Sequence, residues 1–314
     1  MIKKITVLGA GTMGHAIVES FARFDYEVNV YETYDLARQN VKSRIAHDLE
    51  LMAKQNILAS NKIKDYLQNI TIFSDLKKAV EDSDLIIESA VEVLDIKQKL
   101  FKDLENFCKK DAILSTNSSS LSLEDITANL SIQTKKRCIV THFFNPAHIV
   151  PLVELSCFGN TDENIYNEVE SVLQKIEKKP VKIQKDINGL VGNRIQAAIL
   201  REVLSLVDNH VATSKDIDNV LKYGLGFRYA TTGCIQITDL GGLDIWNAVC
   251  DNLLPCIDNT QITNKVLKEK LVSGELGVKS GKGFYDYTNE DVQSVNEAFQ
   301  QRLIVQLKAL GEMN

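Results

Sequence analysis

Two residues that could carry out acid–base chemistry lie inside neighbouring apolar segments. His142 lies near the end of RCIVTHFF (137–144), and Glu154 lies within VPLVELSCF (150–158). A carboxylate in an apolar strand is costly unless it is paired, and the connection between the two segments is short enough for the chain to fold back. We therefore expect the two side chains to meet. A carboxylate that fixes the tautomer of an imidazole and stabilises the imidazolium is the usual partner of a general base.

The alternative for His142 is a core histidine whose nitrogens bind backbone groups, and the nearby acid weakens that alternative. The other histidines have no such neighbour, and we expect structural or surface positions for His15, His47, His148 and His210. The cysteines are scattered without a CxxC pair. We therefore expect reduced thiols, with neither a disulfide nor a metal site, at Cys108, Cys138, Cys157, Cys234, Cys250 and Cys256.

A glycine-rich turn lies in ITVLGAGTMGHAIVESFARFDYEVNVYE (5–32), which reads as strand, turn, helix and second strand. Each glycine of this GxGxxG pattern has a physical role. Gly9 permits the tight turn, Gly11 lets the backbone approach a pyrophosphate, and Gly14 lets the helix and the sheet pack closely. The alternative is the same strand–helix unit without a ligand, but the complete context favours dinucleotide binding.

The residues around this turn extend the cofactor prediction. The helix that begins with Thr12 and Met13 offers free N–H groups and a favourable dipole to the phosphates. Glu32, at the end of the second strand, is placed to accept hydrogen bonds from the ribose hydroxyls. A 2′-phosphate would meet this carboxylate as a like charge, so we expect NAD rather than NADP as the cofactor.

The first half of the chain alternates strand-like and helix-like segments. We expect strands at 4–8, 27–31, 70–74, 84–90, 112–117, 137–144, 150–158 and 180–184, and helices at 12–24, 37–69 (interrupted around 57–61), 97–110 and 162–178. Such alternation predicts an α/β fold with a doubly wound parallel sheet of the Rossmann type. Helical periodicity dominates from about Asp186, so we expect a dinucleotide-binding domain over 1–186 and an all-α domain over 187–314.

Composition restricts the class of protein. The chain has 314 residues, of which 44% are hydrophobic and 25% charged, as is typical of a soluble globular protein with room for two domains. A net charge of −6 argues against nucleic acid as a partner. We see no secretion signal and no apolar run long enough to span a membrane, and we expect a cytoplasmic protein.

Five segments occur in the order found in one enzyme family: NSSSL (117–121), HFFNP (142–146), PLVE (151–154), GLVGNR (189–194) and KSGKGFYDY (279–287). With them the chain resembles, over nearly its whole length, the L-3-hydroxyacyl-CoA dehydrogenases, which include 3-hydroxybutyryl-CoA dehydrogenase. The resemblance implies a Rossmann-type domain, a helical domain through which two copies form a homodimer, and a role in fatty acid metabolism.

The same resemblance implies roles for single residues. His142 corresponds to the catalytic base, Glu154 to its acidic partner and Ser119 to a substrate-binding serine. A helix N-cap is the alternative for the serines, and Ser122 suits that role better than Ser119. Further positions correspond to residues that line the active site or contact the cofactor, namely Glu92, Lys97, Asn117, Asn145, Asn193 and Lys279.

These groups imply a hydride transfer. The 3-hydroxyl of the substrate would bind His142 and Ser119, His142 would take the hydroxyl proton, and C3 would give its hydride to NAD. Asn193 would reach the substrate from the helical domain, which implies an active site between the two domains.

The segment GLGFRYATTGCIQITDLGGLD (224–244) departs from the usual family pattern and is closer to the branch that resembles L-gulonate 3-dehydrogenase and its crystallin relative. Arg228 lies in this segment, where a guanidinium would suit a substrate carboxylate; the alternative is a salt bridge within the protein. The serine and lysine that hold CoA in the family do not align with residues 46–48 and 54–55.

Several functions therefore stay open. A 3-hydroxyacyl-CoA is the first expected substrate, and a small 3-hydroxy acid of the L-gulonate or carnitine type is the second. A non-catalytic NAD-binding, crystallin-like protein is a further alternative, as is another Rossmann enzyme such as a 2-hydroxyacid or imine reductase. HFFNP followed by the downstream glutamate disfavours this last class.

Overall fold

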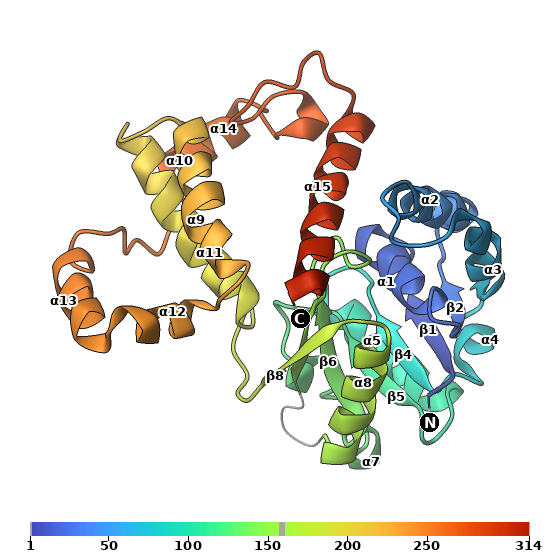
Figure 1. The fold of residues 1–314 in the computed structure, drawn as a ribbon. Coiled ribbons are helices and arrows are strands. Elements are labelled where there is room, and N and C mark those ends of the chain that lie inside the picture. Colours follow the sequence, from blue (N-terminus) through green and yellow to red (C-terminus); the bar gives the residue numbers. More distant parts are fainter. Residues whose placement is uncertain (1, 157–160, 314) are drawn as a thin grey trace. The chain divides into compact units, whose positions relative to one another are not determined.

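The structure is a computed structural model that describes residues 2–156 and 161–313 (Figure 1). Cys157 and the end of the strand expected over 150–158 lie outside the described residues. The chain divides into two compact units, which we call unit 1 (Met1–Asn193 and Gln300–Leu307) and unit 2 (Arg194–Phe299 and Lys308–Asn314). The C-terminal helix thus contributes eight residues, 300–307, to unit 1.

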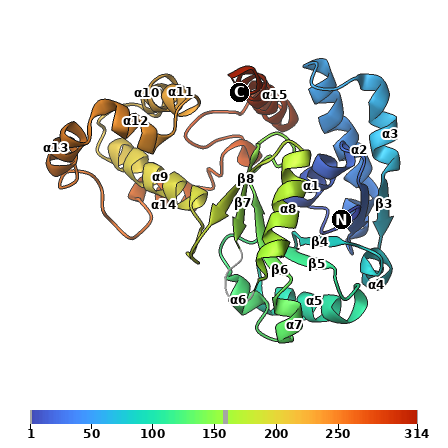
Figure 2. The same ribbon diagram turned by 60° about the horizontal axis from the view of Figure 1, so that its bottom comes forward.

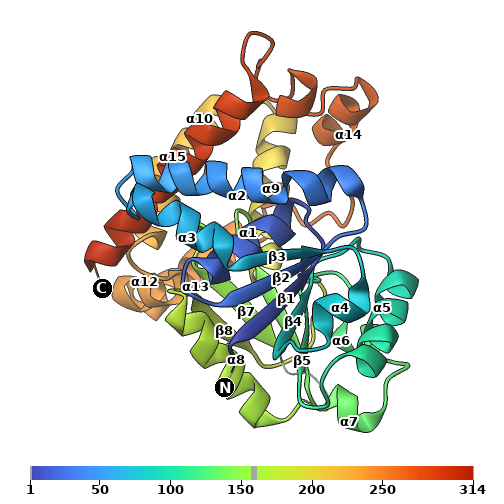
Figure 3. The ribbon, with the colours of Figure 1, turned by 90° about the vertical axis from the view of Figure 1, so that its right-hand side faces the viewer.

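Unit 1 is built on an eight-stranded sheet in the order β3-β2-β1-β4-β5-β6-β7-β8, most of which is visible in Figure 3. The strands are β1 Lys4–Leu8, β2 Glu27–Tyr31, β3 Ile70–Phe73, β4 Leu85–Glu88, β5 Ile113–Thr116, β6 Cys138–Phe143, β7 Leu152–Ser156 and β8 Lys179–Ile183. This order confirms the doubly wound fold. One pair, β6 and β7, is antiparallel, which corrects the expectation of an entirely parallel sheet. A parallel partner needs a long crossover connection, whereas residues 144–151 suffice only for a direct return.

Helices cover both faces of the sheet, as Figure 2 shows. The helices of unit 1 before the strand β8 are α1 Thr12–Ala22, α2 Asp35–Lys54, α3 Ile63–Gln68, α4 Leu76–Val80, α5 Leu94–Phe107, α6 Leu123–Ile126, α7 Ile132–Lys135 and α8 Glu163–Lys175. Apolar residues of α1, α2, α3 and α8 pack in one core, and those of α4, α5 and α6 pack in a second core on the other face. Helical spacing explains these contacts: α5 buries Phe101 and Leu104, and α8 buries Val169, Val172 and Leu173.

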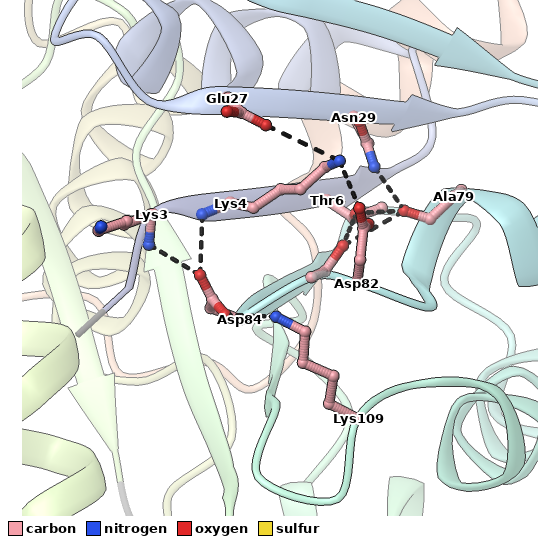
Figure 4. A network of polar contacts seen from close by, with 10 residues as sticks. Lys3, Lys4, Thr6, Glu27, Asn29, Ala79, Asp82, Asp84 and Lys109 are labelled. Carbon is pink, nitrogen blue, oxygen red and sulfur yellow. Dashed lines mark hydrogen bonds and ion pairs between the residues drawn. The ribbon is translucent and has the colours of Figure 1, made fainter.

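Charged residues hold together the amino-terminal end of strand β1 (Figure 4). The Asp84 carboxylate accepts hydrogen bonds from the backbone N–H groups of Lys3 and Lys4, at 2.9 and 3.0 Å, and pairs with Lys109 at 2.7 Å. The Lys4 side chain pairs with Asp82 at 2.7 Å. Ligands bind at the carboxyl ends of the strands in doubly wound folds. These contacts occupy the opposite end of the sheet.

Unit 2 is helical, as expected. Its helices are α9 Gly192–Asp208, whose first residues belong to unit 1, α10 Ser214–Val220, a π-helical turn Leu221–Leu225, α11 Gly226–Tyr229, α12 Cys234–Gly241, α13 Leu243–Leu253, α14 Lys265–Val272 and most of α15 Val292–Met313. Among the described residues of unit 2, only Leu204 and Ile217 are buried large apolar side chains. No helix within the described ranges is both long enough and apolar enough to cross a membrane.

Candidate active site

The glycine turn after β1 has the geometry that close approach requires. Gly9 has a φ of 105°, and a Cβ there would lie 2.6 Å from the carbonyl oxygen of Ser89. A Cβ on Gly14 would lie 1.9 Å from the carbonyl oxygen of Gly9, whereas one on Gly11 would meet nothing within 4 Å. Gly9 and Gly14 are therefore required by packing within the protein, and Gly11 leaves the backbone open on the side where a pyrophosphate is predicted.

Glu32 lies at the edge of a cavity beside this turn. Its carboxylate accepts hydrogen bonds from the N–H groups of Ala10 and Tyr34, at 2.8 and 2.9 Å. The cavity has a volume of about 550 Å³ and is lined by Leu8, Gly9, Gly11, Tyr31, Glu32, Thr33, Leu76, Ser89, Ala90, Val91, Ile96, Lys99, Leu100 and Asp103. Two N–H groups fix the carboxylate but leave lone pairs on both oxygens, so Glu32 keeps the capacity to bind ribose hydroxyls. Nearby, Thr12 is exposed at the start of α1, and the side chain of Met13 packs against the core.

Lys97 is buried in an ionic network at the carboxyl end of β4. Its Nζ lies 2.5 Å from Glu88, which ends β4, and 3.2 Å from Glu92. Glu92 also accepts hydrogen bonds from the hydroxyls of Ser118 and Ser120. Burial raises the pKa of Glu92, but the serine hydroxyls and Lys97 outweigh burial and hold the pKa below its usual range. Lys97 therefore orients two carboxylates, and Glu92 is the member of the network that is exposed enough to meet a ligand.

His142 and Glu154 face each other across the antiparallel pair β6–β7. They are register partners, and His142 Nδ1 lies 2.8 Å from Glu154 Oε2. Both side chains are buried. An ionised carboxylate can only accept a hydrogen bond, so Nδ1 carries the proton and Nε2 is left as an acceptor. The pair thus has the tautomer that a general base requires.

Glu154 also joins this pair to the start of α9. Its Oε1 accepts hydrogen bonds from the N–H groups of Val191 and Gly192, both at 2.9 Å. Burial raises the pKa of Glu154, but His142 and these two N–H groups outweigh burial and lower the pKa. The same contact fixes the position of Asn193, the next residue of the helix.

A phenylalanine and a glycine complete the surroundings of His142. The ring of Phe144 packs edge-on against the imidazole, with the ring centroids 5.1 Å apart. A Cβ on Gly192 would lie 2.1 Å from this ring. Glycine at position 192 therefore lets the helix start close to Phe144, which holds the imidazole from one side.

The polar residues after β5 have separate partners. The Asn117 side chain accepts a hydrogen bond from the N–H of Phe143 at 2.8 Å and so connects β5 to the strand that carries His142. Ser119 is half-buried, and its carbonyl accepts a hydrogen bond from Gly189. Asn145 follows β6 and is exposed. Ser122 caps α6 through a hydrogen bond with the N–H of Asp125, which is the role expected for it.

Two predicted residues belong to unit 2. Arg228 lies on α11 and Lys279 on the short 3₁₀ turn Val278–Ser280, and both are exposed. Their predicted contacts with substrate and cofactor stay predictions.

Sequence reasoning missed Glu88, Phe144 and the contact of Gly192 with the phenyl ring. Glu88 had a signal, because it is an acid at the end of an apolar strand, as Glu154 is an acid within one. The packing of Phe144 against Gly192 had no signal in the sequence, because it depends on how two distant segments approach each other.

Comparisons with known proteins agree with this geometry. Residues 4–187 match the family description "3-hydroxyacyl-CoA dehydrogenase, NAD binding domain", and residues 189–287 match "3-hydroxyacyl-CoA dehydrogenase, C-terminal domain". The chain is 33% identical over 288 residues to the 3-hydroxybutyryl-CoA dehydrogenase of Clostridioides difficile. The aligned region covers 90% of this chain and 99% of the relative.

A second relative is similar over an even larger share of this chain. The chain is 26% identical over 304 residues, 97% of each protein, to the 5-formyl-3-hydroxy-2-methylpyridine 4-carboxylate 5-dehydrogenase of Mesorhizobium japonicum. A crystal structure of an enzyme with this activity, described as an NAD⁺-dependent dismutase, matches with a TM-score of 0.90 at 26% identity and covers 99% of both chains.

The two family matches together span nearly all of both units. The glycine turn, the cavity beside Glu32 and the polar residues at the ends of β4, β5 and β6 lie within the matched NAD-binding part. The chain therefore belongs to the 3-hydroxyacyl-CoA dehydrogenase family, whose members are NAD-dependent oxidoreductases that act on CH–OH groups.

Proposed function

We propose that this enzyme oxidises the hydroxyl of a small free carboxylic acid, with His142 as the general base. The contact between His142 and Glu154 carries the catalytic part of the proposal. It leaves Nε2 free to accept the hydroxyl proton, while the carboxylate stabilises the imidazolium that forms. NAD, held beside the glycine turn by Gly9, Gly11 and Glu32, would supply the acceptor for the hydride that leaves the carbon bearing this hydroxyl. In the reverse direction the imidazolium returns the proton to the carbonyl oxygen.

The surroundings of the pair keep the base in place for this step. Glu154 is held by two N–H groups of the α9 start, so it has no freedom to turn away from the imidazole. Phe144 packs against the ring and restricts its rotation. Such fixed orientation is what a general base contributes beyond its proton affinity. We assign Ser119 and Asn193 to substrate positioning.

The C-terminal helix favours a small acid over an acyl-CoA. The family resemblance puts CoA on the segment after β2, around residues 46–55. Here Met52 is buried in a cluster with Ile304 of α15, and Leu303 and Leu307 pack on the same cluster. Helix α15 therefore covers part of the surface that CoA would need.

Asp48, in the same segment, is turned inward. It is buried and lies 3.2 Å from His15 Nε2. Helix α15 begins at Val292, beyond residue 287 where the family match ends. The relative named for a pyridine 4-carboxylate covers 97% of this chain, against 90% for the 3-hydroxybutyryl-CoA dehydrogenase. The inward position of Asp48, the helix beyond the family match and the larger coverage by the pyridine-carboxylate relative all support a substrate without CoA.

A 3-hydroxyacyl-CoA remains the second candidate, because the 3-hydroxybutyryl-CoA dehydrogenase is the more similar of these two relatives in sequence identity. The experiment that separates the candidates is an assay with NAD(H) on acetoacetyl-CoA, 3-hydroxybutyrate, L-gulonate and carnitine. We expect a larger kcat/KM for a free acid. A kcat/KM for acetoacetyl-CoA that exceeds all free acids by 100-fold would return the CoA ester to first place.

Arg228→Met tests how the acid is recognised. If the guanidinium binds the substrate carboxylate, KM for the acid should rise by roughly 10- to 100-fold, the equivalent of a charged hydrogen bond of about 1.5–3 kcal/mol. The matched control is Lys222→Met, which removes another exposed cation six residues before Arg228 in the same helical region. Equal, small effects of the two changes would assign Arg228 a structural role.

Exposed apolar residues of unit 2 support a homodimer. Phe227, Ile235 and Leu240 are exposed by 70, 79 and 77%. A stable protein rarely leaves so many large apolar side chains in water, and such surfaces mark association sites. We propose that a second copy of this chain covers them.

A further inference from the structure

We propose that the interior of unit 1 contains a binding site for one divalent first-row transition-metal ion, formed by Glu19, Asp48 and His148. Glu19 lies on α1, Asp48 on α2 and His148 in the connection between β6 and β7. Among the described residues, these three offer one ligand atom each within 4.8 Å of one another. All three side chains are buried.

The spacing of the ligand atoms suits a metal ion. Nitrogen and carboxylate ligands bind Zn²⁺ at about 2.0–2.2 Å in a tetrahedral arrangement, so neighbouring ligand atoms lie about 3.3–3.6 Å apart. The three ligand atoms here lie within 4.8 Å of one another, so rotation of the side chains would have to bring them closer around an ion.

Two of the three side chains at this site have polar atoms without a hydrogen-bond partner within the described part of the chain. Both carboxylate oxygens of Glu19 and both ring nitrogens of His148 are buried without a hydrogen bond. The Oε1 of Gln300, on α15, is also buried and accepts no hydrogen bond. The Gln300 side chain lies beside Asp48 and His148 and acts on the pKa of each as a hydrogen-bonding group, so it is the protein group that competes with an ion for these two side chains. A ligand that satisfies several of these groups at once is favoured, because each of them is otherwise desolvated without a partner.

The charged neighbours do not replace such a ligand. Lys178 is buried nearby, but its Nζ donates to the carbonyl oxygens of Ala147 and Val150, at 2.6 and 3.0 Å. Arg23 and Lys178 act on Glu19 only at a distance, since neither makes a hydrogen bond to its oxygens. His15 binds Asp48 and orients it, as second partners of metal ligands commonly do.

The donor set indicates which class of ion would bind. Two carboxylates and one imidazole, with an amide oxygen beside them, suit Zn²⁺, Mn²⁺ or Fe²⁺ better than the oxygen-only preference of Mg²⁺ or Ca²⁺. Burial lowers the pKa of His148 to about 4, which keeps the imidazole in its neutral, ligand-binding form. Burial also raises the pKa of Glu19 well above its usual range, so metal binding would displace a proton from Glu19.

The bound ion would connect separate parts of unit 1. It would join α1, α2 and the connection that follows His142, with α15 beside them. We assign it a structural role in holding this connection and the C-terminal helix, with no part in the hydride transfer. The competing explanation is a buried network in which a protonated Glu19 shares its proton with His148 or Gln300.

Calorimetric titration of the full chain with Zn²⁺, after removal of metal by a chelator, tests the proposal. We expect one ion per chain, with affinity at least 100-fold weaker in Glu19→Gln and in His148→Asn. The matched controls are Glu50→Gln, an exposed acid on the same helix as Asp48, and His210→Asn, an exposed histidine. Both controls should bind as the unaltered protein does.

A spectroscopic readout keeps the test independent of calorimetry. Co²⁺ bound to the unaltered chain should show visible absorption, and His148→Cys should add a near-ultraviolet thiolate-to-cobalt band that the unaltered chain lacks. The proposal is overturned if the unaltered chain binds no stoichiometric Zn²⁺ or Co²⁺, and this result requires no variant to fold. It is also overturned if Glu19→Gln and His148→Asn bind like the controls, which would favour the shared-proton network.

Discussion

Unit 1 buries its apolar side chains within itself, whereas unit 2 leaves most of its own exposed. In unit 1, two cores fill both faces of the sheet, and large residues such as Phe21 and Phe101 are fully buried. In unit 2, Ile235 and Leu240 are more than three-quarters exposed. Burial of an apolar side chain contributes about 1.5–3 kcal/mol. The proposed homodimer would account for this difference, because a second copy would cover the apolar side chains that unit 2 exposes.

The candidate site shows the same contrast. His142, Glu154, Glu92 and Lys97, all in unit 1, have hydrogen-bonded or ionic partners at defined distances. Arg228, in unit 2, is exposed. The proposed base and most of the predicted cofactor contacts therefore belong to unit 1, whereas the predicted substrate contact Arg228 and the predicted cofactor contact Lys279 belong to unit 2.

The largest effect should come from His142→Ala, which removes the proposed base from unit 1. We expect kcat to fall by ~10²–10⁴-fold, the usual contribution of a general base, while NADH binding, measured by fluorescence titration, stays within a few-fold of normal. Glu154→Gln should also lower kcat strongly, because an amide whose oxygen accepts from Val191 and Gly192 presents its NH2 to His142 Nδ1, which favours the tautomer with Nε2 protonated. A near-normal kcat for His142→Ala would mean that another residue is the base.

The next largest effect should come from charges on the exposed apolar surface of unit 2. Leu240→Glu combined with Leu243→Glu, at positions 77 and 64% exposed, should weaken self-association by at least about 100-fold in sedimentation experiments. Ile132→Glu in unit 1, at a position 65% exposed, is the matched control and should leave assembly unchanged. Unaltered assembly in the double variant would show that these residues are not part of the dimer interface.

Much of the sheet could be predicted from the sequence because its signals are local. The alternation of strands and helices, the glycine turn and the change to helical periodicity near Asp186 each lie within a short window. The approach of His142 to Glu154 could also be inferred, since the two residues flank one short connection and an acid within an apolar strand needs a partner. That connection also determines the antiparallel pairing of β6 and β7, which the expectation of a parallel sheet did not include.

The rest depends on contacts between distant segments. Nothing in residues 292–313 indicates that part of α15 packs with Met52 and Ile149 in unit 1. His15 and His148 have no motif around them, and burial beside Glu19 and Asp48 arises only when three elements meet. Helical spacing predicts that a face is apolar, but not which surface will cover it.

Gly192→Ala tests the packing of Phe144 against the start of α9, where the chain passes from unit 1 to unit 2. The added Cβ would lie 2.1 Å from the Phe144 ring, so the ring or the start of α9 must move. Overpacking of this kind costs about 1–3 kcal/mol of unfolding free energy, and we expect kcat to fall several-fold because Phe144 holds His142. Gly224→Ala in unit 2, where an added Cβ meets nothing within 4 Å, is the control. Equal thermal stability of the two variants would argue against this packing role.

The smallest effect on stability and on kcat should come from Glu32→Gln, which changes cofactor preference within unit 1 and leaves the proposed base intact. Glu32 presents a negative charge at the cavity predicted to hold the adenosine ribose, where a 2′-phosphate would be repelled. We expect the unaltered enzyme to prefer NAD strongly, and the variant to narrow the ratio of kcat/KM values for NAD and NADP by roughly ten-fold, the equivalent of about 1.4 kcal/mol. Part of this change should be lost NAD affinity, because the amide has one acceptor oxygen where the carboxylate has two.

The matched control is Glu27→Gln, an exposed acid at the other end of the same strand, which should leave the ratio unchanged. Glu27 differs from Glu32 in its distance from the cavity rather than in its chemistry, so any effect of overall charge appears in both variants. If the unaltered enzyme uses NAD and NADP equally well, Glu32 does not lie beside the 2′ position. The cavity at the end of β2 would then hold another part of the cofactor.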